Sequence, residues 1–143
     1  MFPRLIPAVA ILIESISHLR AEASPNAGEI AAYPVTAYGA VADPLAYSTA
    51  AIQKAINAAH AAGGGTVIFP PGRFLSGTLE LKSGVTLNLQ AGCTLLASRE
   101  AADYRALGDV QAPVLIRADK ARAIAITGQG TIDGQAVQAW PST

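Results

Sequence analysis

The stretch TLELKSGVTLNLQAGCTLLA, from Thr78 to Ala97, decides the fold class, because apolar and polar residues alternate along most of it. Alternation with a period of two is typical of short β-strands that bury one face. Ser83-Gly84 and Ala91-Gly92 interrupt the pattern, so successive strand centres lie about seven or eight residues apart. Such connections are too short for helical crossovers, which excludes a doubly wound sheet.

The alternation assigns side chains to two faces. We expect the apolar members to lie inside: Leu79, Leu81, Val85, Leu87, Leu89 and Leu95. The polar members Glu80, Lys82, Thr86 and Asn88 should point outward, where they could contact a ligand or simply face solvent. Cys93 continues the inward pattern and is expected to behave as a small buried hydrophobe. Ile124 and Ile126 resume the pattern further along the chain.

The preceding segment predicts one strand, one helix and another strand. Pro34–Val41 alternates weakly and is expected to be a strand, and Ser48 or Thr49 should cap a helix. The helix has apolar residues at the spacing of one face, ends at three glycines, and carries a structural His60 near its end. Val67 and Phe69 then start a strand that Pro70-Pro71-Gly72 should end in a turn.

Two architectures fit this pattern. One is an antiparallel meander with glycine-containing hairpin loops. The other is a parallel β-helix, in which three strands and three bends of the observed spacing give about 22–24 residues per coil. Ser-Gly and Ala-Gly bends, in place of Asn-Gly turns, favour the β-helix. The Ala-rich helix would then stand where a solenoid needs a cap over its apolar end.

The N-terminal stretch has the character of a leader. A basic start, the apolar run Leu5–Ile13 and the small-residue site Ala21-Glu22-Ala23 predict a signal peptide over residues 1–23, hence export. An amphipathic helix over Ile6–Leu19 is the alternative. Residues 24–33 should form a linker, and residues 34–143 a folded portion of one domain.

Composition excludes several function classes. The 143 residues carry 10 basic and 10 acidic side chains, so no electrostatic signature of a nucleic-acid partner is present. One cysteine and two histidines cannot build a closed structural zinc site or an intramolecular disulfide. We expect no cofactor and no metal. Along the chain no basic cluster is apparent.

Four segments resemble polygalacturonase-type glycoside hydrolases of family 28, in the order that family has: Val35–Asp43, Thr49–Ser98, Ala102–Tyr104 and Ala123–Gly134, followed by Trp140. The resemblance implies a right-handed parallel β-helix, all-β apart from an N-terminal capping helix, and action on pectin. Related lyases and epimerases share the first half. The Gly-x-Gly-x-Ile-Asp-Gly piece at Gly128–Gly134 narrows the resemblance towards hydrolases.

The catalytic motifs of that family are missing. Inverting glycosidases use a carboxylic acid and a carboxylate on opposite sides of the scissile bond. In this family an Asn-x-Asp, an Asp-Asp, a Gly-His-Gly and an Arg-x-Lys motif supply the site, and none occurs here. The acidic residues after the leader contain no adjacent pair: Glu29, Asp43, Glu80, Glu100, Asp103, Asp109, Asp119 and Asp133. Asp133, before Gly134, predicts a turn. We therefore assign no catalytic residue and expect this chain alone to be inactive.

Three functions remain open. The first is the N-terminal portion of an exported pectin-degrading hydrolase, a monomer that acts on polygalacturonate when its catalytic coils are present. The second is a β-helix lyase or epimerase, which abstracts a proton beside the uronate carboxylate. The third is a carbohydrate-binding solenoid without catalysis. We favour the hydrolase.

Overall fold

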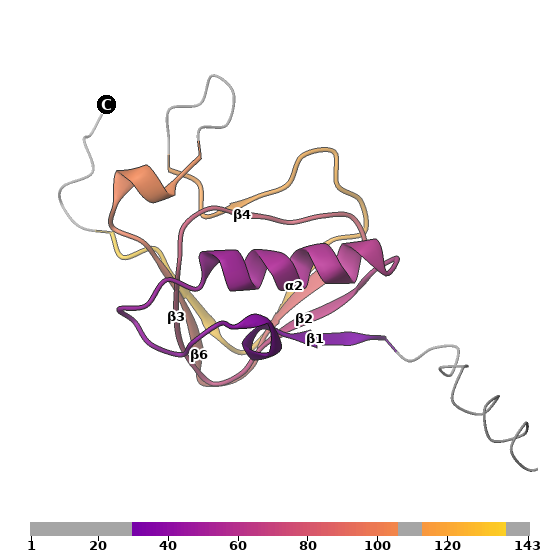
Figure 1. Cartoon of the computed structure of the whole chain (residues 1–143), viewed down its shortest axis with the longest axis horizontal. Helices are drawn as coiled ribbons and strands as arrows, with labels where there is room; N and C mark the ends of the chain where they lie inside the picture. The colour runs from indigo at the N-terminus through magenta and orange to yellow at the C-terminus, as the bar shows by residue number, and fades with distance from the viewer. Residues whose placement is uncertain (1–29, 106–112, 137–143) are drawn as a thin grey trace, which may run out of the picture.

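The computed structural model describes residues 30–105 and 113–136 (Figure 1). Within them lie one α-helix, two 3-10 helices and nine short strands. The helices are η1 (Val35–Tyr38), α2 (Thr49–Ala61) and η2 (Ala101–Asp103). The strands are β1 (Ala32–Pro34), β2 (Gly65–Phe69), β3 (Gly72–Ser76), β4 (Leu79–Glu80), β5 (Val85–Leu89), β6 (Cys93–Ala97), β7 (Ile116–Arg117), β8 (Ala125–Gly128) and β9 (Thr131–Asp133). No described helix is long and apolar enough to cross a membrane.

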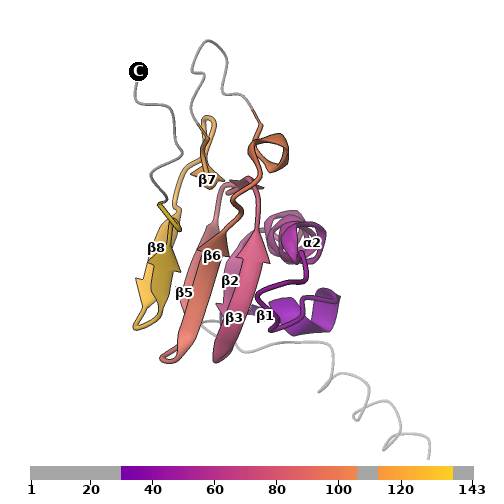
Figure 2. The same cartoon turned by 90° about the vertical axis from the view of Figure 1, so that its left-hand side faces the viewer.

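The strands form three parallel sheets, in the orders β1-β2-β5-β8, β3-β6-β9 and β4-β7. From β2 onward, consecutive strands lie in different sheets, so that strands far apart in the sequence lie side by side (Figure 2). Every pairing is parallel, as between Val67 and Leu87 or Phe74 and Leu95. The parallel β-helix is therefore confirmed, and the antiparallel meander is excluded.

The length of a turn differs from the expected 22–24 residues. Gly65 pairs with Val85, 20 residues later, and Gly72 pairs with Cys93, 21 residues later. The third sheet departs further, because Leu79 pairs with Ile116. The segment between β6 and β7, which includes η2, enlarges the second coil without changing the register of the strands.

The predicted inward face is the core. Leu79, Val85, Leu87 and Leu95 are fully buried, while Leu81 and Leu89 are 3% and 2% exposed. Cys93 is 1% exposed, as expected of a small buried hydrophobe. Where the first coil turns from β2 to β3, Phe69 and Phe74 pack edge to face with centroids 6.1 Å apart. Inward residues of successive coils thus stack into continuous columns.

Three predictions about the first segment were wrong in detail. The strand expected over Pro34–Val41 is β1, which ends at Pro34 and begins at Ala32, inside the expected linker; the 3-10 helix η1 follows it. β3 was missed, because Pro70-Pro71-Gly72 suggested only a turn and Phe74-Leu75-Ser76 is buried without alternation. The Ser48 side chain does not cap α2: its Oγ accepts from the N–H of Val41 and donates to the same residue's carbonyl.

Helix α2 lies at one end of the stacked coils and β8 at the other (Figure 2). The buried face of α2 is the predicted one: Ile52, Ala55, Ile56 and Ala59. The two alanines allow a close approach to the first coil, and the two isoleucines are fully buried. The helix ends before Gly63 and Gly64, whose φ angles of +94° and +125° suit glycine. The predicted role of the glycine run in ending the helix is confirmed.

The side chain of Gln53 on α2 binds the backbone of β4 as a neighbouring strand would. Its Nε2 donates to the carbonyl of Glu80 at 3.0 Å, and its Oε1 accepts from the N–H of Glu80 at 2.8 Å. A strand edge exposes both groups, and leaving them without partners is unfavourable. One side-chain amide therefore satisfies the outer edge of β4.

Two more polar residues of α2 continue this contact. The Oγ1 of Thr49 accepts from the N–H of Gly77 at 2.9 Å. The Nδ1 of His60 lies 2.9 Å from the carbonyl oxygen of Ser83. The structural reading of His60 is thereby supported, and α2 is joined to the third side of the first coil at both ends and in its middle.

Close packing explains why glycine occupies positions 128 and 130. Gly128 has φ +105°, and a Cβ on it would collide with the backbone carbonyl of Leu89. A Cβ on Gly130 would meet the Leu89 side chain at 2.7 Å and the carbonyl of Cys93 at 2.9 Å. The bend between β8 and β9 therefore lies directly against the preceding coil, which only glycine permits.

Candidate functional site

The described carboxylates are mostly engaged in local structure. Asp133 Oδ1 accepts from the N–H of Gln135 at 2.8 Å, which confirms the predicted turn role. Asp43 makes the same kind of turn with the N–H of Leu45. Glu80 lies 3.9 Å from Arg117 Nε across the β4–β7 pair. Among the described residues no three His, Cys, Asp or Glu side chains gather where they could hold a metal.

The outward polar residues of β5 form part of a ladder. Asn88 Nδ2 donates to Thr127 Oγ1 at 3.0 Å, and these residues are in register between β5 and β8. Thr86 lies between Thr66 and Ala125 in the same sheet. Asn88 and Thr127 already bind each other, and neither of the two hollows described below includes a residue of β5, so this face is a poor candidate for a ligand site.

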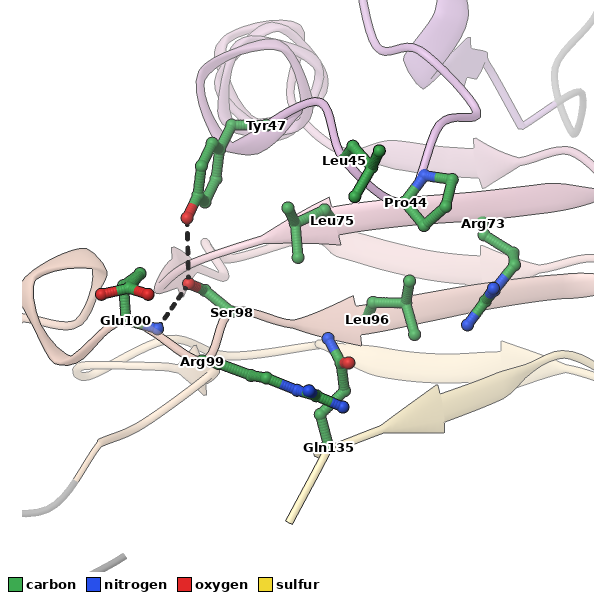
Figure 3. A pocket seen from close by; sticks show the side chains of 10 residues that line it. All are labelled: Pro44, Leu45, Tyr47, Arg73, Leu75, Leu96, Ser98, Arg99, Glu100 and Gln135. Atoms are coloured by element: carbon green, nitrogen blue, oxygen red, sulfur yellow. Dashed lines mark hydrogen bonds between the residues drawn. The ribbon is translucent and has the colours of Figure 1, made fainter. Parts of the chain in front are cut away.

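A groove on the outer face of the sheet β3-β6-β9 is a better candidate (Figure 3). Its volume is about 520 Å³, within the range that small ligands occupy. The side chains lining it come from the loop before α2, from β3, from the end of β6 and from the segment after β9: Pro44, Leu45, Tyr47, Arg73, Leu75, Leu96, Ser98, Arg99, Glu100 and Gln135.

The floor of this groove is apolar. Leu75 and Leu96 are in register on β3 and β6, and Tyr47 forms a parallel bridge to Leu75. Both leucines sit where alternation predicts a solvent-facing side chain, yet they are only 9% and 1% exposed. Leu45 and Tyr47 beside them are 86% and 55% exposed. The groove thus has buried leucines below and an exposed apolar wall along one side.

Ser98 fixes the polar end of the groove. Its Oγ lies 3.3 Å from the hydroxyl of Tyr47, donates to Asp103, and accepts from the N–H of Glu100 at 3.0 Å. The Tyr104 hydroxyl donates to the Ser98 carbonyl. Burial, together with the negative charge of Asp103 and the neighbouring Tyr47, raises the pKa of Tyr104, so this donor keeps its proton. The wall residue Tyr47 is consequently held in place.

Two arginines bring positive charge to the groove. Arg73 extends from β3 and Arg99 follows β6, and the two side chains approach Leu96 from opposite sides (Figure 3). Both are exposed, and neither guanidinium makes a hydrogen bond or ion pair with another described residue. The sequence showed no basic cluster, but the coil register creates one by placing β6 beside β3.

A smaller hollow beside α2 is less suited to a ligand. Its volume is about 370 Å³, and it too holds two basic residues, Lys54 and Arg105. However, no aromatic or large aliphatic side chain lines it. The side chains of Gln53 and Thr78 in its lining already form hydrogen bonds with backbone groups.

The architecture defines the class of protein, a parallel β-helix built of stacked coils. Residues 33–94 match the family described as rhamnogalacturonase A/epimerase, pectate lyase-like. The family 28 exopolygalacturonase of Yersinia enterocolitica has a similar structure, with a TM-score of 0.68 and 36% identity over 78% of this chain and 22% of that one.

Relatives found by sequence show which enzymes the chain resembles. An exo-poly-α-D-galacturonosidase of Dickeya chrysanthemi is 50% identical over 70 residues, 49% of this chain and 11% of the relative. A mannuronan C5-epimerase of Azotobacter vinelandii is 53% identical over 53 residues, 36% of this chain and 4% of the relative. The resemblance to polygalacturonase-type hydrolases of family 28 is confirmed, and this chain spans about a tenth of the galacturonosidase's length.

Proposed function

We infer that this chain is the N-terminal portion of an exported, pectin-degrading glycoside hydrolase of the polygalacturonase type. The observation that carries this proposal is the 50% identity with a galacturonosidase over 70 residues, within coils that stack as a parallel β-helix. The complete enzyme would hydrolyse α-1,4-galacturonosidic bonds by inversion, with one carboxylic acid protonating the leaving oxygen and a carboxylate activating water. Its catalytic carboxylates would come from further coils.

The carboxylates described above support inactivity of the present chain. An inverting enzyme needs an acid and a base about 6.5–9.5 Å apart across one bond. Asp43, Asp103 and Asp133 are each bound to a neighbouring hydroxyl or backbone N–H, and Glu80 faces Arg117. A reducing-sugar assay on polygalacturonate tests the proposal by comparing this chain with a version extended through downstream coils. Turnover by the short chain, or none by the extended one, contradicts it.

We further propose that the β-helix is right-handed and that α2 is its N-terminal cap. The right-handed sense follows from the rule for crossovers between parallel strands. The cap is supported by the apolar face of α2 on the first coil and by the bonds from Gln53 to Glu80.

We propose that residues 1–23, which lie outside the described residues, are a signal peptide that directs export of the protein. Ala23 would be the last residue removed and Ser24 the first of the mature chain. Mass spectrometry of the exported protein should find Ser24 at its N-terminus. An intact Met1 on protein recovered from the cytoplasm contradicts a signal peptide.

A lyase or epimerase is the second candidate, favoured by the 53% identity with the mannuronan epimerase over 53 residues. Such an enzyme removes the proton beside the uronate carboxylate; a lyase then eliminates the glycosidic oxygen, whereas an epimerase returns a proton on the other face. The products discriminate the three reactions. A saturated reducing end indicates hydrolysis, an unsaturated uronate indicates elimination, and an intact polymer with inverted residues indicates epimerisation.

A further inference from the structure

The groove lined by Tyr47, Arg73, Leu96 and Arg99 combines two features that one class of ligand needs together. Its floor and one wall are apolar, since Leu75 and Leu96 lie below and Leu45 and Tyr47 alongside. Its two guanidinium groups are unused by the described residues. A uronic acid also has two such parts, a face of C–H groups and a planar carboxylate.

We propose that this groove binds a uronic-acid unit of a polysaccharide, with Arg73 and Arg99 as the carboxylate ligands and Tyr47 as the surface against which the sugar ring packs. The inference rests on the proposed function for the choice of acidic sugar. A guanidinium group donates two parallel hydrogen bonds to a carboxylate, and such charge-assisted bonds are about twice as strong as neutral ones. The Tyr47 ring supplies apolar area and remains 55% exposed for that contact.

The site is organised before any ligand arrives. Tyr47 is tied at its backbone by the bridge to Leu75 and at its hydroxyl by Ser98, 3.3 Å away. Ser98 is 1% exposed and is itself held by Asp103. A wall fixed at both ends loses little conformational entropy on binding, which favours affinity.

The remaining polar groups suit sugar hydroxyls. Gln135 uses its Nε2 to donate to the carbonyl of Ala97 at 2.7 Å, and its side-chain oxygen makes no described hydrogen bond. Glu100 lines the same end and supplies carboxylate oxygens, which accept from hydroxyl groups. Glu100 also repels anions, so the two arginines must outweigh one negative charge for an acidic ligand to be preferred.

The test measures binding of a galacturonic acid trisaccharide to the intact chain by titration calorimetry, beside a neutral galactose trisaccharide. We expect the acidic sugar to bind at least 10-fold more tightly, and its affinity to fall as salt is raised. Arg99→Gln and Arg73→Gln should each reduce that affinity 10-fold or more. Arg99→Lys, which keeps the charge but loses the fork, should cause an intermediate loss.

Arg122→Gln is the matched control, because Arg122 is exposed and lies outside the groove. It removes the same charge and should leave the affinity within twofold. Equal binding of the two trisaccharides, or an equal loss from Arg122→Gln and Arg99→Gln, overturns the inference. Circular dichroism of each variant identifies any loss that comes from unfolding, and in that event the Arg99→Lys result decides.

The result is separable from the proposed function. If the extended enzyme hydrolyses polygalacturonate while the groove variants bind the trisaccharide normally, this inference fails and the hydrolase assignment stands. If the groove binds uronate with the expected arginine dependence but the extended enzyme shows no hydrolysis, the hydrolase assignment fails and the subsite stands.

Discussion

Apolar side chains in the same column are buried in the middle coil and exposed in the last coil. Leu87 and Leu95 belong to the middle coil and are fully buried. One register step further, Ile126 and Ile132 occupy the same columns but are 48% and 43% exposed. Burial in this architecture is therefore a property of having a coil on each side, and alternation along a strand is only its precondition.

At the end of the stack that carries α2, other contacts take the place of a neighbouring coil. On the outer side of the first coil, β1 pairs with β2, Tyr47 makes a single bridge to β3, and Gln53 binds β4. Full strand pairing thus gives way to one bridge and then to a side-chain amide. Val67, Phe74 and Leu79 of that coil are all fully buried. One short strand, a helix and a few polar contacts therefore take the place of a complete turn of strands.

The largest predicted effect contrasts the middle coil with the last one. Leu87→Ala should lower the free energy of unfolding by about 2–5 kcal/mol, because it leaves a cavity between two coils. Ile126→Ala in the same column should cost much less, about 1 kcal/mol or below, since its side chain is already 48% in solvent. Urea unfolding followed by circular dichroism measures both. Equal losses would show that β8 is as well covered as β5.

The next effect concerns the end covered by α2. Gln53→Ala leaves the N–H and carbonyl of Glu80 without their partner and should destabilise the chain by about 1–3 kcal/mol. Lys54→Ala is the control on the next residue, which is exposed, and should stay within about 0.5 kcal/mol. Gln53→Glu, which turns a carboxylate oxygen towards the Glu80 carbonyl in place of a donor, should cost at least as much as Gln53→Ala. An unchanged Gln53→Ala variant would mean that water replaces the amide at no cost.

The effect that is smallest at neutral pH, and develops only in alkali, concerns Cys93 in the middle coil. Burial raises the pKa of its thiol from 9.0 to about 11. Above pH 9 the unfolded chain loses this proton first, so the free energy of unfolding should fall as pH rises from about 9 to 11. At pH 8 the native thiol should react with a disulfide reagent at least 100-fold more slowly than in denaturant. Equal rates would mean that the coil opens readily.

Alternation predicted the core because it is a local property. The residues from Leu79 to Leu95 reveal their faces within a window of a few positions. β3 was missed for the opposite reason: Leu75 holds an outward position yet is only 9% exposed, and its neighbour Tyr47 comes from elsewhere in the chain. Where tertiary contacts cover an outward position, the alternation that would reveal the strand disappears.

The groove could not have been predicted in the same way. Arg73 and Arg99 are separated in sequence by β4, β5 and β6, and nothing in the intervening sequence links them. They meet because Gly72 pairs with Cys93, and that register fixes where β6 ends relative to β3. Tyr47 joins them through a single bridge. By contrast, the turn role of Asp133 needed only its neighbour Gly134 and was predicted correctly.

The amide of Gln53 also has a consequence for how molecules of this kind associate. A stack with two free faces could add copies head to tail without limit and grow into a fibre, since such a contact does not close on itself. Gln53 occupies the outer edge of β4, so at the α2 end only β1 and part of β3 keep free pairing groups among the described residues. A second copy therefore cannot pair along all three sheets at this end. One glutamine thus disfavours head-to-tail addition at the α2 end and lowers the tendency of such stacks to form fibres.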